Sequence, residues 1–289
     1  MADLLTRATE PLPRGVVAIG MPIAGVVLTL FFVYLGFPYQ RLAMQLATQL
    51  EAATDVRVDF ADIGPHVGLL GPGLEAHGVV ATPLARAPVR FDRVRLRPAW
   101  SISWFRGEPS VYVDAEGASG SISGAVTVGA QPGFDGVLRG VDLGALPLGD
   151  LGGGHIDGTV DAEADLVLEP DGPYGTLLVD ARAGSVLIPN SPVAIPFETL
   201  SGDLRFGGEK YVFVDRLELA GPMLDAKIEG SIGHARGRNP SQAPLDLLIQ
   251  LEVRGAGARS ALQAVGVRLS RSGTGTVRLT GPLGNPRIR

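Results

Sequence analysis

The chain has 289 residues, with 25 Lys and Arg against 30 Asp and Glu, a net charge of −5 and no cysteine. The lack of cysteine excludes disulfides, zinc–thiolate sites and a cysteine nucleophile. Apolar residues make up 45% of the chain, which excludes a disordered composition, and the acidic balance argues against nucleic-acid binding.

The first predicted element is a membrane anchor at residues 16–37, after a short tail at residues 1–15. Its sequence, VVAIGMPIAGVVLTLFFVYLGF, is almost wholly apolar and lies in a stretch without charged residues. As a helix it would span about 33 Å, compared with about 30 Å for the hydrocarbon core of a bilayer. A cleaved signal peptide is the competing interpretation, but the run is longer than the usual apolar region and FPYQRL is a poor cleavage site. The residues expected to form the anchor surface are Val16, Ile19, Val27, Leu30, Phe31, Phe32 and Phe37.

Residues 38–53 predict a short amphipathic connector helix, because Leu42, Leu46, Leu50 and Ala53 recur at helical spacing and Pro38 suits its start. From residue 54 to 289 the period changes to two. Val56, Val58 and Phe60 alternate with Arg57 and Asp59, and the same pattern recurs in about a dozen runs separated by turn signals.

Only one further helix is expected, around residues 257–266. Many short strands with few helices predict a large antiparallel sheet, because parallel strands need long crossovers. Glycines within strands, such as Gly158, favour a curved sheet. The pattern leaves open one continuous curl or two subdomains meeting near VLRGVDLGALPLGD at residues 137–150.

The stretch GGGHIDGTVDAEADLVLE at residues 152–169 is the strongest candidate for chemistry, because it combines glycines, a histidine and five carboxylates. As a strand, however, it places Asp161, Glu163 and Asp165 in a row along one wet face, where they do not converge on an ion. Its glycines lack the spacing of a phosphate-binding loop. No other motif points to a reaction, so the sequence predicts no enzyme, no metal and no cofactor. The residues expected to line the inner face of the sheet are Ile156, Val160, Leu166, Leu168, Ile228 and Ile249.

A basic and aromatic segment follows one of the predicted strands. Arg93, Arg95 and Arg97 alternate along FDRVRLRP, and Trp100 and Trp104 come directly after it. These residues form a candidate partner or membrane-surface patch. The alternative is an edge strand that runs into an aromatic segment anchored in the core.

Three segments carry a family resemblance: TDVRVDFADIGPHVGLLGPGLEAHGVV after the connector, FDRVRLRPAWSISWFRGEPSVYVDAEGASGSISGAV, and the ending ALQAVGVRLSRSGTGTVRLTGPLGNPRIR. The order of tail, anchor, helix and strands is similar to AsmA-like envelope proteins. The length resembles one branch of that group, the family of type II secretion system protein N. The resemblance implies an AsmA-like groove, that is, a curved, partly open antiparallel sheet held in the periplasm by a single anchor in the bacterial inner membrane.

The resemblance also implies two functions. The first is a non-enzymatic accessory or assembly component of type II secretion, which contacts other parts of the machine such as the inner-membrane platform or the secretin. The alternative is a groove protein that binds or transfers lipid. No catalytic residues accompany either function, and an envelope enzyme is the least favoured hypothesis.

Overall fold

The fold of the protein is seen in a computed structural model, which describes residues 23, 25–26, 28–29, 32–34, 36–54, 56–68, 71–83, 88–99, 109–127, 129, 131–144, 155–169, 172–187, 194–207, 211–233, 242–264 and 266–288. Within these residues the chain forms helix α3 (Tyr39–Thr54), helix α4 (Ala256–Ala264) and a sheet of fifteen strands. The strands are β1 (Val56–Asp59), β2 (Asp62–Gly68), β3 (Gly71–Pro83), β4 (Val89–Pro98), β5 (Ser110–Gly117), β6 (Gly120–Thr127), β7 (Gly133–Asp142), β8 (His155–Glu169), β9 (Gly172–Leu187), β10 (Ala194–Gly207), β11 (Tyr211–Ala220), β12 (Leu224–Gly233), β13 (Pro244–Val253), β14 (Thr274–Pro282) and β15 (Arg287–Ile288).

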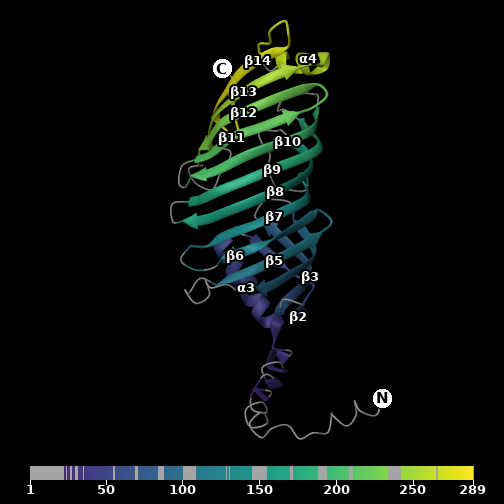
Figure 1. The fold of residues 1–289 in the computed structure, drawn as a ribbon, viewed down its shortest axis with the longest axis vertical. Helices are drawn as coiled ribbons and strands as arrows, with labels where there is room; N and C mark the ends of the chain where they lie inside the picture. The colour runs from purple at the N-terminus through teal and green to yellow at the C-terminus, as the bar shows by residue number, and fades with distance from the viewer. Residues whose placement is uncertain are drawn as a thin grey trace, which may run out of the picture.

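The strands pair in chain order in one continuous antiparallel sheet. The one departure is at the start, where β1 and β2 both pair with the long strand β3. Figure 1 shows the strands stacked along the long axis of the molecule, with α3 near one end and α4 at the other. The prediction of a large curved antiparallel sheet with few helices is therefore confirmed, and of the two topologies left open the structure has the single sheet.

The strands form where the sequence alternates between apolar and polar residues. On β8, Val160 and Ala164 are buried, whereas Glu163 and Asp165 are exposed. In the register, Ala162 lies between Leu138 on β7 and Val179 on β9. Because the side-chain period matches across neighbours, one face of the sheet becomes apolar and the other polar.

The longest strands bend where the alternation is interrupted. Two consecutive exposed residues occur at Arg139 and Gly140 on β7, and again at Arg182 and Ala183 on β9. The register shifts next to the first of these positions and again beside Gly158 on β8, and Gly140, Gly158 and Ala183 all have positive φ. Such β-bulges bend a strand and increase its twist. The predicted role of Gly158 as a point where the sheet bends is consistent with this geometry.

The core lies towards the α4 end of the sheet. Ile195 and Phe197 on β10 are 1% and 2% exposed, and they belong to a cluster of buried side chains that extends from β7 to β14. Ala258, Ala261 and Leu262 of α4 are also buried. The predicted second helix is thus confirmed, and it covers the apolar residues of the last strands.

The described residues between 23 and 36 are helical, and their aliphatic and phenylalanine side chains are exposed; Phe32 is 61% exposed. Phe37, which follows this helical stretch, is 44% exposed. In the part of the chain that the structure describes, no helix has both the length and the apolar character needed to cross a bilayer. The other predicted anchor residues, Val16, Ile19, Val27, Leu30 and Phe31, lie outside the described residues.

The predicted connector helix is present as α3, which packs against β1 and β2. Its described inward side chains are Tyr39 and Ala43, which are buried, and Ala47, which is half-buried. The side chains of Leu42, Leu46, Leu50 and Ala53, on which the prediction rested, are outside the described part.

Candidate functional site

The apolar face of the sheet is the first candidate surface. It is built from alternate residues that pair across neighbouring strands: Leu96 with Val113, Val126 with Phe134, Leu217 with Ile228, and Leu247 with Leu279. The face thus continues from β4 to β14. Its side chains are almost all aliphatic, as is usual for sheets that bury one side.

Burial varies along this apolar face. Near α4 its residues are enclosed, and Val253 is only 3% exposed. On β5, β6, β8 and β12, by contrast, Val113, Ile122, Leu166 and Ile228 are only half-buried. The sheet's own side chains and α4 therefore enclose part of the apolar face and leave other parts of it only half-buried.

The structure brings the predicted lining residues onto this face, but not equally. Val160 is 4% exposed and belongs to the core, while Ile156, Leu166, Ile228 and Ile249 are half-buried. Leu168 is 55% exposed. The reason is that β7 begins at Gly133, opposite Val167, so the end of β8 has a paired strand on one side only.

The helix before α3 is joined to the sheet by Tyr34. The backbone N–H of Gly73 on β3 donates to the Tyr34 hydroxyl over 3.2 Å, and that hydroxyl lies 3.0 Å from the carbonyl oxygen of His66 on β2. The Tyr39 hydroxyl in turn bonds to the Tyr34 carbonyl. The edge-to-face rings of Tyr34 and Tyr39 have centroids 5.9 Å apart. These contacts fix the hairpin of β2 and β3 to the helix that leads into the sheet.

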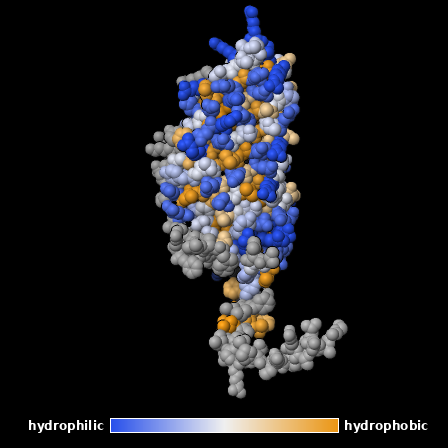
Figure 2. All heavy atoms as spheres, viewed as in Figure 1, coloured by the Kyte–Doolittle hydropathy of each residue, from blue (hydrophilic) through white to orange (hydrophobic). Residues whose placement is uncertain are grey.

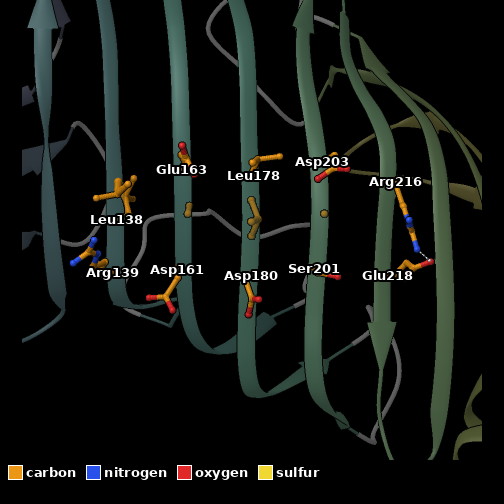
Figure 3. A pocket seen from close by; sticks show the side chains of 14 residues that line it. Leu138, Arg139, Asp161, Glu163, Leu178, Asp180, Ser201, Asp203, Arg216 and Glu218 are labelled. Carbon is orange, nitrogen blue, oxygen red and sulfur yellow. Dashed lines mark hydrogen bonds and ion pairs between the residues drawn. The ribbon is translucent and has the colours of Figure 1, made fainter.

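The polar face carries the second candidate surface, a hollow of about 630 Å³ over β7 to β11. Figure 3 shows Arg139, Asp161, Asp180 and Ser201 side by side on successive strands, with Glu163, Leu178 and Asp203 in a neighbouring row. In Figure 2, hydrophilic residues cover most of the face in view, with smaller hydrophobic patches between them. The predicted row on β8 thus becomes part of a charged surface that crosses several strands.

Like charges face one another in this hollow. Asp161 lies directly opposite Asp180, an arrangement that destabilises a sheet when it is not compensated. Arg182 partly offsets the repulsion between the two carboxylates, because its Nε donates to Asp180 over 3.0 Å. This contact raises the pKa of Arg182. Asp161 accepts a 2.8 Å bond from the N–H of Gly140.

Opposite charges meet at the far side of the hollow. Glu218 on β11 pairs with Arg216 at 2.8 Å and with Lys227 at 3.1 Å. Hydrogen bonds from Lys227 and Arg216 lower the pKa of Glu218. Among the described residues, no group of three or more side chains is arranged to hold a metal ion. The hollow is therefore a surface on which carboxylates and basic side chains lie close together.

The arginines of the predicted basic patch contact side chains on neighbouring strands of the sheet. Arg93 pairs with Glu116, Arg95 donates from Nε to Glu75 over 2.8 Å, and the guanidinium of Arg97 lies 4.0 Å from the ring centre of Tyr112. Trp100 and Trp104 lie outside the described residues. The three arginines therefore connect β4 to the strands on either side of it.

The sequence did not predict that two histidines lie beside this patch. Glu75 lies 3.2 Å from Nδ1 of His66 and 3.0 Å from Nε2 of His77, in addition to its bond with Arg95. The hydrogen bond from Arg95 is the main reason that the pKa of Glu75 is lowered, although burial opposes it. Only the alternation of β3 could have indicated that Glu75 and His77 share a face.

Searches of family models, of curated proteins and of solved structures gave no match to this chain.

Proposed function

We propose that this protein is a non-enzymatic lipid-binding protein, held in the bacterial inner membrane by residues 16–37, whose apolar face holds hydrocarbon chains of lipids in the periplasm. The observation that carries the proposal is the half-burial of aliphatic side chains on the apolar face, such as Val113 on β5, Ile122 on β6 and Leu166 on β8. An extended apolar surface that is not enclosed by the protein's own side chains is characteristic of an interaction site.

The chemistry of the face favours hydrocarbon as the occupant. The paired residues that form it, from Leu96 and Val113 to Leu247 and Leu279, offer no hydrogen-bonding side chains. An extended peptide laid there would leave its N–H and C=O groups without partners, at a cost of about 1–3 kcal/mol for each group. A hydrocarbon chain has no such groups, and each buried methylene contributes about 0.8 kcal/mol.

The polar heads would stay outside the apolar surface. The charged groups of the molecule, including Glu163 and Asp165 on β8, point to the opposite face. A lipid bound along the strands would therefore leave its headgroup at the rim of the sheet, in water.

A matched pair of variants on β8 tests the proposal. Leu166 and Val167 are neighbours, both half-buried, and they point to opposite faces of the sheet. The full chain is extracted in mild detergent, and lipid retained by Leu166→Glu and Val167→Glu is measured by native mass spectrometry. We expect lipid on the wild type and on Val167→Glu, and at least a fivefold loss on Leu166→Glu.

A photoreactive amino acid placed at position 166 or 167 keeps the test decisive if Leu166→Glu fails to fold. Cross-links to lipid from position 166 but not from 167 support the proposal. A wild type without bound lipid, together with equal cross-linking from both positions, would overturn it.

The polar face favours a second function, that of an accessory component of type II secretion that acts by protein contacts. Glu163 on β8 and Asp203 on β10, the strands on either side of β9, face the hollow as part of a broad charged surface. Such surfaces steer charged partners and determine which of them bind. In cells, cross-links from position 203 to the secretin or the inner-membrane platform, absent from position 123 on β6, would support this function. Unchanged secretion in a strain that lacks the protein would contradict it.

A further inference from the structure

Helix α3 lies across the first strands of the sheet and leaves a cavity of about 160 Å³ beneath it. The helix contributes Tyr39, Ala43 and Ala47 to the cavity wall. The sheet contributes the remaining lining residues, which come from β1 to β4 and the β1–β2 turn: Val58, Phe60, Ile63, Leu74, Ala76, Val79, Val94 and Leu96.

The cavity exists because the inward stripe of α3 has small side chains. Tyr39, Ala43 and Ala47 recur every four residues, so they lie on one side of the helix. Tyr39 fills the space nearest the start of the helix, whereas the two methyl groups of Ala43 and Ala47 leave a gap above Leu74 and Val94. Larger residues at these positions would close the gap without any change in the strands.

The lining of the cavity suits an apolar ligand. Every described lining side chain is apolar except for the phenol of Tyr39, and that hydroxyl is already bonded to the carbonyl of Tyr34. Water needs two to four polar partners to occupy a buried site, and apolar cavities of about 150 Å³ remain dry and bind small apolar molecules.

The position of the cavity indicates the source of its ligand. Helical residues directly before α3, among them Val26, Leu28 and Phe32, expose between 59% and 61% of their surface. Within the proposed anchor, these side chains would lie in the hydrocarbon of the membrane. The cavity wall begins at Tyr39, and Tyr34 ties the hairpin of β2 and β3 to the same helix. With residues 16–37 as the proposed anchor, the cavity lies at the end of the sheet that is next to the membrane.

We propose that this cavity is a binding site for the terminal part of one acyl chain of a membrane lipid, and that the apolar face takes up its lipid at this end. The inference rests on the proposed function, since it identifies the place where the hydrocarbon first binds. At the opposite end, Ala258 and Leu262 of α4 belong to the same buried cluster as Val253 on β13 and Val277 on β14.

The test uses the full chain in vesicles of phosphatidylethanolamine and phosphatidylglycerol that contain a lipid with a diazirine at the end of one acyl chain. After illumination, mass spectrometry locates the cross-linked residues. We expect cross-links to cavity residues such as Leu74 and Val94. Ala47→Leu fills the cavity and should reduce these cross-links at least fivefold. Thr48→Leu adds a leucine at the next, exposed position of α3 and should leave them unchanged.

The outcomes separate the cavity from the wider function. Cross-links on Leu166 and Ile228 with none on the cavity residues would overturn the cavity site and leave the lipid-binding face intact. Equal cross-linking of the cavity in Ala47→Leu and the wild type would also overturn it. No cross-links on either region would overturn both proposals. If Ala47→Leu does not fold, the map of cross-links on the wild type still decides the question.

Discussion

The ring of Phe197 on β10 occupies the space that a side chain on Gly184 of β9 would need. The two residues are direct neighbours across the strands, and a Cβ at position 184 would collide with the ring. The same ring lies 3.3 Å from the place where a Cβ on Gly158 of β8 would stand. One aromatic side chain thus covers two glycines on successive strands beside the bend. Such covering by an aromatic residue is known to stabilise glycines in sheets.

Replacing Phe197 with alanine should destabilise the protein by about 3–5 kcal/mol, because a fully buried aromatic ring is lost and its space cannot collapse. The measurement is the free energy of unfolding in urea. Phe213→Ala is the control, since that ring is half-buried on the polar face beneath Arg205. It should cost markedly less. Equal losses for the two variants would contradict the assigned role of Phe197.

The contact between Phe197 and Gly184 predicts coupling between their substitutions. Gly184→Ala alone should be destabilising, since the new methyl meets both the ring and the backbone oxygen of Asp157. In the double variant with Phe197→Ala, the ring is gone and only the backbone contact remains. The combined loss should therefore fall short of the sum by at least about 0.5 kcal/mol, which exceeds the usual additivity error.

The backbone conformation of Ala183 predicts that replacing it with glycine stabilises the protein. It has a φ of 49°, the one non-glycine residue with positive φ in the described part of the chain. A residue with a side chain costs about 1–2 kcal/mol in this region. Glycine avoids that cost, but it gives the unfolded chain more conformational freedom, which lowers stability by about 0.4–1 kcal/mol. Ala183→Gly should thus raise the free energy of unfolding by about 0.5–1 kcal/mol on balance.

The control for this prediction lies two residues earlier on the same strand. Ala181 is 0% exposed and has no positive φ, so Ala181→Gly should be destabilising. Urea unfolding of both variants checks the pair. A loss of stability in Ala183→Gly as large as that in Ala181→Gly would show that the backbone at 183 is not strained.

The pairing of Glu75 predicts how stability depends on pH. Because Arg95 lowers the pKa of Glu75, the folded state holds the charged carboxylate more strongly than the unfolded chain does. This contribution is fully present above the unfolded-state pKa of about 4.3 and is lost as pH falls through the lower folded-state pKa. The wild type should therefore lose stability more steeply than Glu75→Gln below about pH 4.3.

Unfolding free energies of the two proteins between pH 7 and pH 3 provide the measurement. Asp246→Asn is the matched control, because Asp246 also has a lowered pKa through its paired bonds to Arg278 but is 50% exposed. Solvent screens exposed pairs, so its effect on the pH profile should be smaller. Parallel profiles for the wild type and Glu75→Gln would rule out a stabilising role for the Glu75 cluster.

Removing the Tyr34 hydroxyl should change hydrogen exchange at one backbone amide. Tyr34→Phe removes the acceptor of the Gly73 N–H, and a net loss of about 1 kcal/mol should speed exchange at that amide about fivefold. Tyr39→Phe removes a hydroxyl that bonds to the Tyr34 carbonyl and not to Gly73 in the described part of the chain, so Gly73 should stay protected. Unchanged exchange at Gly73 in Tyr34→Phe would show that the helix is not held to the hairpin in this way.

Much of the architecture can be predicted from the sequence because it depends on local patterns. Alternation along residues 155–169 indicates a strand with Val160 and Ala164 inside and Glu163 outside, and the structure agrees. Helical spacing indicates α3 and α4 in the same way. Both periods are properties of a single segment, so no knowledge of its neighbours is needed.

The candidate sites depend on contacts between segments, which only the tertiary structure decides. The sequence by itself determined an antiparallel sheet with one apolar face, whereas strand register decided that Asp161 meets Asp180 and that Glu75 meets Arg95 and two histidines. The packing of α3 decided that Ala43 and Ala47 lie over the sheet and leave a cavity. The physical reason is that register and helix docking are set by the summed fit of many distant side chains, which no local period encodes.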